Sequence, residues 1–342
     1  MAVSLKQIAE ASNVSIATVS RVLRDRGEIA PATRRRVMEA AERLRYRPNL
    51  LVKGLQTGRT QSCGVLMELS DPFNAQIFVG LQDELILDDY APVVLRASVS
   101  RSDANEPDEL RQIHRLLDRR VDGIVLRPVR DAASDQYLQE VWDRGIPLVA
   151  VDRQLPHSHA DFVGSADEEG GRLAAEYLLQ LWHRNLAQIA GPSFTSTGRQ
   201  RAEGFAAAVR ECPGAVCHHR EDPSFNDGIR QAEDLLRMPD PPTAIFAGND
   251  LIATGIYQVA RQMGLRIPSD LSVVGFGDLQ IASHLSPRLT TIRQDPRQIG
   301  KSAARLLMQR INQELDADSA QCLEIPTKLM VRSSSCGRGS QL

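Results

Sequence analysis

Several features that would define other classes of protein are missing from this 342-residue sequence. No apolar run approaches the roughly 18 residues that a membrane-crossing helix needs, so we expect no contact with a membrane. The five cysteines form no CxxC pair and are odd in number, which disfavours a disulfide framework and indicates reduced thiols. Because the first residues also contain no apolar signal segment, we expect a cytoplasmic protein.

Catalytic signatures are missing as well. The sequence has no GxxxxGKS/T phosphate loop, no GxSxG nucleophile turn and no HExxH zinc helix. The pairs His157-x-His159 and His218-His219 lie in polar stretches without a matching set of Cys, Asp or Glu, so we expect no metal site. The sequence therefore predicts a protein that is not an enzyme and needs no cofactor.

A net charge of only −2 conceals an uneven distribution of charge. Residues 1–61 contain 12 Lys and Arg against 5 Asp and Glu, whereas residues 62–342 contain 29 against 38. A small cationic head on a large acidic body is typical of a protein whose head contacts nucleic acid.

The head has the start and stop signals of short helices. Ser4 and Gln7 have the spacing of a capping box, which predicts a helix that starts near Leu5. Asn13 suits the left-handed turn that would end this helix. Ser15 can then cap a second helix, so the two helices are joined by a tight turn, as in a helix-turn-helix.

The second helix is amphipathic, and its two faces suggest different roles. Val19, Val22 and Leu23 form an inner face, while an outer face is free to enter the major groove of DNA. The residues expected to contact DNA are Ser15, Ile16, Ala17, Thr18, Ser20 and Arg21. Pro31 suits the first turn of a third helix, although Ala30 before it cannot supply a side-chain cap. A generic basic three-helix domain is the alternative interpretation of this segment.

The body alternates short apolar runs with amphipathic stretches, a pattern that predicts an α/β fold with doubly wound parallel sheets. The predicted strands are residues 64–69, 92–97, 123–126, 147–151, 187–190, 244–246 and 272–275. The predicted helices include residues 76–88, 169–181, 199–209 and 252–263, and a tail adds a helix at 297–309 and strands at 322–325 and 329–331. The number of predicted strands is larger than a single sheet usually contains, which indicates two lobes. In such folds a ligand lies beyond the carboxyl ends of the strands, between the lobes.

The chain resembles the lactose-repressor (LacI/GalR) family over its whole length. In the head the resemblance is carried by Val14-Ser15-Ile16-Ala17-Thr18-Val19-Ser20-Arg21-Val22-Leu23 and Tyr46-Arg47-Pro48-Asn49. In the body it is carried by Asp71-Pro72-Phe73, Val151-Asp152-Arg153, Arg201-Ala202-Glu203-Gly204-Phe205, Phe246-Ala247-Gly248-Asn249-Asp250 and Leu289-Thr290-Thr291-Ile292-Arg293-Gln294.

The resemblance implies an all-α helix-turn-helix head (residues 1–47), a hinge or linker (48–61) and a two-lobed, periplasmic-binding-protein-like sensor (62–342). We expect lobe 1 at about 62–158 plus 292–320 and lobe 2 at about 161–290 plus 321–335. The hinge would fold on DNA in the minor groove, started by Asn49, with Leu55 as a wedge between base pairs. A flexible linker is the alternative for this segment.

The resemblance also implies an effector site between the lobes. The family's contacts map onto Phe73, Asn74, Arg127, Asp152, Arg201, Phe225, Asn249 and, in the altered motif Gly277-Asp278, Asp278. For three of these residues a purely structural role is the alternative to effector binding: Arg201 as a surface charge, Phe225 as a core residue and Asn249 as a helix cap. Gly277 stands where the family often has an aspartate, and Arg127, Arg153 and Arg201 are all cations. We therefore hypothesise an anionic effector, such as a sugar acid or a sugar phosphate.

The sequence as a whole predicts a transcription regulator, most simply a repressor, whose affinity for a pseudo-palindromic duplex operator depends on a small carbohydrate-derived effector. It would work at the nucleoid as a homodimer, since the last residues contain no leucine heptad that would tether a tetramer. A sugar carrier for a transporter and a sugar-modifying enzyme are the rival classes. A protein co-regulator in place of the small molecule is a third possibility.

Overall fold

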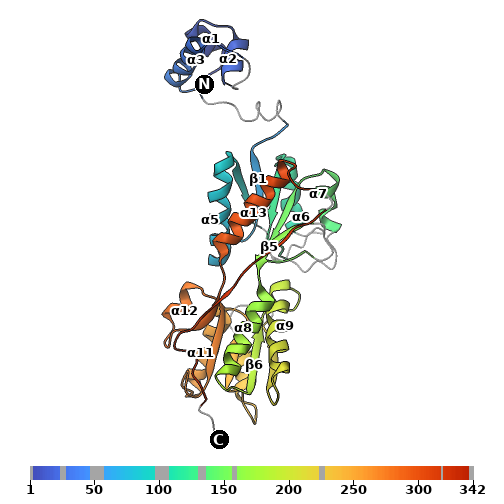
Figure 1. Cartoon of the computed structure of the whole chain (residues 1–342), viewed down its shortest axis with the longest axis vertical. Helices are drawn as coiled ribbons and strands as arrows, with labels where there is room; N and C mark the ends of the chain where they lie inside the picture. Colours follow the sequence, from blue (N-terminus) through green and yellow to red (C-terminus); the bar gives the residue numbers. More distant parts are fainter. Residues whose placement is uncertain are drawn as a thin grey trace. The chain divides into compact units, whose positions relative to one another are not determined.

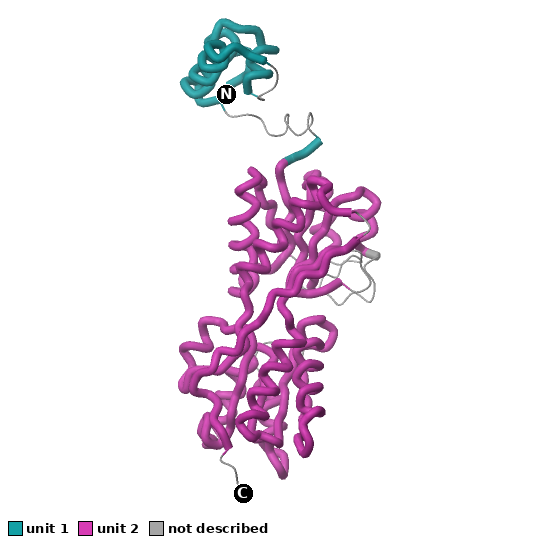
Figure 2. The backbone as a smooth tube through the Cα atoms, viewed as in Figure 1, with its two compact units in different colours: residues 1–60 teal, residues 61–342 magenta. Residues whose placement is uncertain are grey.

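The structure is a computed structural model that describes residues 3–23, 28–46, 58–96, 108–129, 136–155, 160–222, 228–316 and 319–338. The chain divides into two compact units, Met1–Thr60 and Gln61–Leu342 (Figure 2). Asn49, Leu55 and Phe225, three of the residues expected to bind DNA or effector, lie outside the described residues.

The first unit contains three helices, α1 (Leu5–Ser12), α2 (Ile16–Leu23) and α3 (Pro31–Arg43). The predicted capping box is confirmed, because Ser4 N–H donates to Gln7 Oε1 at 2.8 Å and Gln7 N–H donates to Ser4 Oγ at 3.4 Å. Asn13 ends α1 with a φ of 50°, in the left-handed region that was predicted. Ala30 makes no side-chain cap for α3, also as expected.

The core of the first unit is built from apolar residues at helical spacing. Ile8, Val19 and Val37 are completely buried, one from each helix, and Val22 and Ala40 pack beside them. Each helix is short and would be marginal in water by itself, so this shared core is what holds the three together.

The first lobe of the second unit has a six-stranded parallel sheet in the order β11-β5-β4-β3-β1-β2. Its strands are β1 (Ser62–Leu66), β2 (Ala91–Leu95), β3 (Gly123–Leu126), β4 (Leu148–Val151), β5 (Asp161–Ser165) and β11 (Cys322–Ile325). Helices α5 (Pro72–Leu85) and α13 (Pro296–Ile311) cover one face, as Figure 1 shows, and α6 (Asp108–Asp118) and α7 (Gln139–Asp143) cover the other. Two short 3₁₀ helices, η1 (Ile86–Asp88) and η2 (Gln136–Leu138), complete this lobe.

The second lobe repeats this plan with the sheet order β12-β10-β9-β8-β6-β7, in which only the β10–β12 pair is antiparallel among the described strands. Its strands are β6 (Asn185–Ala190), β7 (Val216–Glu221), β8 (Ala244–Ala247), β9 (Ser272–Gly277), β10 (Thr290–Arg293) and β12 (Lys328–Met330). Helices α8 (Asp167–Gln180) and α9 (Ser196–Glu211) pack on one face, and α10 (Ile229–Leu236), α11 (Asp250–Gln262) and α12 (Gln280–His284) pack on the other. Doubly wound parallel sheets were the prediction, and they are what the body contains.

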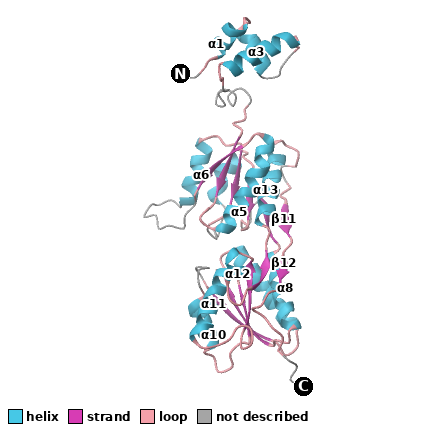
Figure 3. Cartoon of the chain, turned by 90° about the vertical axis from the view of Figure 1, so that its left-hand side faces the viewer, coloured by secondary structure: helices cyan, strands magenta, loops and turns pink. Residues whose placement is uncertain are grey.

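The lobe boundaries expected from the sequence need correction. β5 and β11 belong to the sheet of the first lobe, where they pair with β4 and with each other, and β10 belongs wholly to the second. The chain therefore passes between lobes directly after Ser165, after Arg293 and after Ile325, and Figure 3 shows β11 and β12 on either side of the last passage. The first error arose because Asp161 opens a strand without an apolar run. Asp161 is nevertheless 97% buried there, since Arg310 neutralises it through two 2.8 Å bonds.

Two other strands escaped the sequence pattern. β7 is the edge of its sheet and consists mainly of polar residues, and β10 is only four residues long. Of the helices in the described ranges, none combines the length and the apolar character that crossing a bilayer requires.

The close contact of α8 and α9 places the start of α9 beside the junction of the lobes. A side chain on Gly171 would put its Cβ 2.1 Å from the carbonyl oxygen of Arg201, and one on Gly204 would put it 1.9 Å from that of Glu168. The two helices can approach this closely only because each has a glycine at the crossing. This contact fixes the backbone that carries Arg201.

Candidate functional site

A cavity of about 270 Å³ lies between the two lobes of the second unit. The first lobe contributes Asp71, Phe73, Arg127, Asp152 and Arg153, and the second contributes Thr197, Arg201, Asn249, Leu251, Phe276, Gly277 and Leu279. Gln294, in a segment that connects the lobes, completes the lining. Several of these residues, among them Arg127, Asp152 and Gln294, follow directly on the carboxyl end of a strand, which is where the sequence placed a ligand.

Arg127 and Asp152 form an ion pair on the first-lobe wall. They follow the neighbouring strands β3 and β4, and the Arg127 guanidinium donates to Asp152 Oδ2 from Nε at 2.8 Å and from Nη2 at 2.7 Å. Asp152 is 97% buried and has a φ of 64°, a conformation that L-residues rarely adopt. This strained turn points its carboxylate at Arg127, so the two charges largely cancel.

Arg201 is held by three groups of the second lobe. Its Nε donates to Asp167 Oδ1 at 2.8 Å and its Nη1 donates to the Gly248 carbonyl at 3.0 Å. The guanidinium carbon also lies 3.9 Å from the centre of the Phe276 ring, in a cation–π contact. Burial raises the pKa of Asp167 to about 7, although Arg201 opposes the rise. The alternative that Arg201 is a surface charge is wrong, because the residue is 93% buried.

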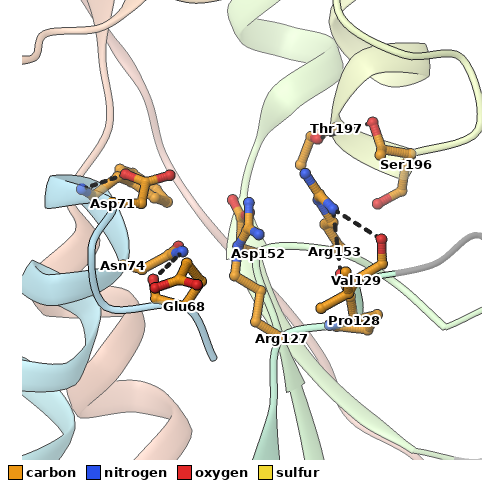
Figure 4. A network of polar contacts seen from close by, with 12 residues as sticks. Glu68, Asp71, Asn74, Arg127, Pro128, Val129, Asp152, Arg153, Ser196 and Thr197 are labelled. Atoms are coloured by element: carbon orange, nitrogen blue, oxygen red, sulfur yellow. Dashed lines mark hydrogen bonds and ion pairs between the residues drawn. The ribbon is translucent and has the colours of Figure 1, made fainter. Parts of the chain in front are cut away.

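Arg153 differs from the other two cations. Its Nη1 reaches only the carbonyl oxygens of Pro128 and Val129, at 3.4 and 3.5 Å, and it forms no ion pair with any described residue. Its Nε is buried and has no hydrogen-bond partner. Figure 4 shows the side chain between these carbonyls and the start of α9. Burial, followed by the positive charge of Arg127, lowers the pKa of Arg153 to about 10.

Asn249 both caps α11 and lines the cavity. Its Oδ1 accepts from Ile252 N–H at 2.7 Å, so the capping role that the sequence left open is confirmed. Asp250, the next residue, is completely buried behind the lining, where it accepts from Thr291 Oγ1 at 2.6 Å and from Leu279 N–H at 2.7 Å. Burial raises the pKa of Asp250 to about 6.

The structure brings five of the eight predicted effector residues to the cavity: Phe73, Arg127, Asp152, Arg201 and Asn249. Asn74 is not in the lining. It is 99% buried at the start of α5, where its Nδ2 donates to the Glu68 carbonyl at 2.8 Å (Figure 4). Phe225, as noted above, falls outside the described residues.

Asp278 also lies outside the lining. Arg293 and Arg332 each donate to its carboxylate at 2.6 Å, and these two cations hold it beside the last residue of β10. Gly277, which does line the cavity, has a φ of 125°. A conformation of this kind is strained for any residue with a side chain, so the backbone itself keeps the position free of a carboxylate.

Sequence reasoning missed several lining residues, above all Thr197, Phe276 and Gln294. Phe276 lies inside β9, one residue before its end, and Thr197 is inside α9, so neither follows directly on a strand. Gln294 follows directly on β10, a strand that the sequence pattern did not show, in a segment that connects the lobes. The resemblance motif 289–294 contained this residue without giving it a role.

The outer face of α2 is accessible, as predicted for DNA contact. Ile16 is 49% exposed, and Ala17 and Arg21 are exposed as well. Ser15 Oγ accepts from Thr18 N–H at 3.1 Å, so these hydroxyl groups also start the helix. The exposed apolar side chain of Ile16 suits contact with base edges, including thymine methyl groups.

Comparison with known proteins agrees with this architecture. Residues 4–49 match the model for bacterial regulatory proteins of the lacI family, and residues 175–335 match a periplasmic binding protein-like domain. Catabolite control protein A of Priestia megaterium is 30% identical, covering 98% of this chain and all of that protein. A lac repressor dimer bound to operator and the anti-inducer ONPF is 27% identical with a TM-score of 0.83, covering 98% of this chain and 99% of the other. A complex of the regulator CelR with cellobiose is 30% identical with a TM-score of 0.71, covering 97% and 99%. The chain belongs to the LacI family and is a DNA-binding transcriptional repressor.

Proposed function

We propose that this repressor binds a small anionic sugar derivative in the cavity between its lobes, and that this ligand controls its affinity for operator DNA. The observation that carries the proposal is the state of Arg153. It is the one cation of the lining with no carboxylate partner among the described residues, and its Nε has no hydrogen-bond partner.

The charges of the cavity favour an anion. Asp152 neutralises Arg127 and Asp167 neutralises Arg201, both at 2.8 Å or less. Arg153 is partly buried and has no ion-pair partner among the described residues, although Asp71 and Asp152 lie near enough to attract its charge. A cation that has lost part of its hydration in this way is costly, and a ligand carboxylate or phosphate reduces that cost by pairing with it. The guanidinium of Arg153 is suited to such a group because it can donate two parallel hydrogen bonds.

The rest of the lining suits a hydroxylated ring of small size. Asp152 is an acceptor for sugar hydroxyls on the first-lobe side, and the side-chain amide of Asn249 belongs to the lining contributed by the second lobe. Phe73 offers an apolar surface for the face of a ring. A volume of about 270 Å³ lies at the small end of ligand pockets, which favours a ligand of single-sugar size.

The DNA side of the proposal rests on the head. We infer that Ser15, Ile16, Ala17, Thr18, Ser20 and Arg21 contact a pseudo-palindromic operator from a homodimer, with Asn49 and Leu55 in a hinge that forms on the duplex. The exposed face of α2 and the lac repressor dimer on operator described above support this arrangement. Its place of action would be the nucleoid in the cytoplasm.

Calorimetry on the full chain tests the ligand. We expect D-glucuronate or D-glucose 6-phosphate to bind, and neutral D-glucose, D-ribose and cellobiose to bind at least about tenfold more weakly, since they leave Arg153 unpaired. Tight binding of a neutral sugar alone would refute an anionic effector.

A pair of variants tests the residue. Arg153→Gln removes the unpaired charge and should weaken binding of the acidic sugar by about tenfold or more, because charge-assisted bonds to the ligand are lost. Arg199→Gln is the matched control: it removes one exposed charge from α9, outside the lining, and should leave the affinity within about twofold. Equal losses in both variants would show that general charge, and not Arg153, attracts the ligand.

A further inference from the structure

Three segments connect the lobes, and they are bonded to one another. The first, Ser165-Ala166-Asp167, joins β5 to α8, the second contains Gln294 and joins β10 to α13, and the third joins β11 to β12. Ala166 N–H donates to the Ile325 carbonyl at 3.0 Å, which links the first segment to the start of the third. The connecting segments are therefore hydrogen-bonded side by side, so a displacement of one segment also displaces its neighbours.

Gln294 bonds the second segment to the first. Its Nε2 donates to Ser165 Oγ at 2.8 Å, across 129 residues of sequence. Gln294 is 94% buried and Ser165 is 97% buried, so solvent cannot readily replace this bond. Gln294 is also part of the lining of the cavity, and thus it touches both the site and the connection.

A second lining residue, Arg201, is bonded to the opposite end of the segment Ser165-Ala166-Asp167. Arg201 donates to Asp167, which lies two residues after Ser165 and opens α8. The segment Ser165-Ala166-Asp167 is therefore bonded at each end to a side chain of the cavity wall.

We propose that Gln294 is a positioning residue that couples occupancy of the cavity to the angle between the lobes through its bond to Ser165. This inference rests on the proposed function, since it requires a ligand in the cavity. An amide that donates to Ser165 still has an acceptor oxygen, and a ligand hydroxyl that donates to this oxygen strengthens the donated bond by polarising the amide. The ligand then favours the lobe arrangement in which the Gln294–Ser165 bond is formed, and this difference in affinity is what shifts the equilibrium.

The decisive variant is Ser165→Ala, because it removes the far end of the bond and leaves the lining intact. Ser272→Ala is the matched control. Ser272 is also a completely buried serine, and its hydroxyl bonds to His183 and to the Cys336 carbonyl in the core of the second lobe, outside the connecting segments. Both variants lose one buried hydroxyl, but only one of them loses the link to the cavity.

The measurements use the full chain and a duplex selected from a random pool by the wild-type protein. Calorimetry gives the affinity for D-glucuronate and D-glucose 6-phosphate, and fluorescence anisotropy gives the duplex affinity with and without saturating sugar. We expect Ser165→Ala to bind the sugar within about threefold of wild type, while the change in duplex affinity caused by the sugar shrinks by about fivefold or more. Ser272→Ala should keep that change. A Ser165→Ala protein with the full wild-type response overturns the proposal.

Two further readouts keep the test independent of other failures. If Ser165→Ala does not fold, hydrogen exchange on wild type takes its place: the sugar must alter exchange at Ala166, whose N–H bonds to Ile325, and an unchanged rate overturns the proposal. If no acidic sugar binds wild type, the proposed effector is wrong. The coupling is then tested by comparing the duplex affinities of the two variants with that of wild type, without any ligand. A shift of about threefold or more in Ser165→Ala, but not in Ser272→Ala, supports the coupling, and equal affinities overturn it.

Discussion

The charged side chains of the cavity are mostly committed to the protein itself. The family resemblance implies Arg201 as an effector contact, yet its Nε is bonded to Asp167 and its Nη1 to Gly248, and one face of its guanidinium lies on Phe276. Arg127 is committed to Asp152 in the same way. These pairs make the wall rigid, and Arg153 is left as the group that a ligand can satisfy.

Arg201→Ala should therefore damage the fold as well as the site. It leaves Asp167 buried without its partner, and we expect the free energy of unfolding to fall by about 3 kcal/mol. Burial already places the pKa of Asp167 at about 7 in the folded chain, above its ordinary range, so its protonated form favours folding and stability is lost as pH rises through that value. Urea denaturation should show a larger deficit at about pH 8.5 than at about pH 5.5.

Two companion variants check this reasoning. Asp167→Asn in the Arg201→Ala background removes the stranded charge and should recover part of the stability and flatten the pH dependence. Arg199→Ala removes an exposed arginine two positions away and should change stability by no more than about 0.5 kcal/mol. The same deficit at both pH values would contradict an unpaired Asp167 as its cause.

Several helices in this chain begin where a side chain can satisfy one of the first free N–H groups. Ser4, Asp71, Thr195, Asn249 and Asp295 each accept from a backbone N–H at the start of a helix. α3 has no such bond, because Ala30 has no side-chain acceptor, and the same is true of α7, α8, α10 and α12 among the described helices. In the small head, α3 therefore lacks the stabilisation that a side-chain cap would give its first turn.

Ala30→Ser should stabilise the head by about 1 kcal/mol, since a serine at this position can accept from the first turn of α3. Hydrogen exchange of the buried Val37 and Ala40 amides in the full chain would report it as slower opening of the helix. Ala32→Ser makes the same chemical change inside the exposed first turn, where it offers no cap and should cost up to about 0.5 kcal/mol. If both variants slow exchange equally, capping is not the explanation.

At the scale of the whole molecule, the features expected for DNA binding and for ligand binding belong to different compact units. The unit up to Thr60 has the excess of positive charge and the exposed α2 face, and the unit from Gln61 has the cavity and the connecting segments. The second unit is itself two lobes of the same design, so its parts can rotate against each other about three short connections. We propose that a ligand between the lobes acts through those connections.

Arg21→Ala should separate the two activities. We expect it to reduce the preference for the selected duplex over random competitor by about tenfold or more, because an exposed arginine on α2 can pair with a base edge. The affinity for the acidic sugar should stay within about twofold of wild type, since the residue belongs to the other compact unit. Arg266→Ala, an exposed arginine of the body, is the control in anisotropy and calorimetry. Undiminished discrimination in Arg21→Ala would remove α2 from the recognition surface.

Most of the strands and helices, the doubly wound class and the helix-turn-helix follow from local signals, whereas β5, β7 and β10 do not. The Ser4–Gln7 capping box, the left-handed Asn13 and the apolar run at β3 act within a few residues, so sequence alone could predict them. Five of the eight effector residues implied by the resemblance are also found in the lining. Arg127, Asp152 and Asn249 among them lie just past the ends of β3, β4 and β8, at the edge of the sheet where parallel folds bind ligands.

Other features depend on partners that are distant along the chain. The sequence does not reveal that Arg310 neutralises Asp161 in β5, that two arginines draw Asp278 away from the cavity, or that Asp167 already binds Arg201. The energy of a charge is set by its three-dimensional neighbours and by its distance from water, and neither is encoded within a window of sequence. Local patterns thus determined which chemical groups reach the cavity, and tertiary packing alone decided that Arg153 is the one left unpaired and that Gln294 connects the cavity to the junction of the lobes.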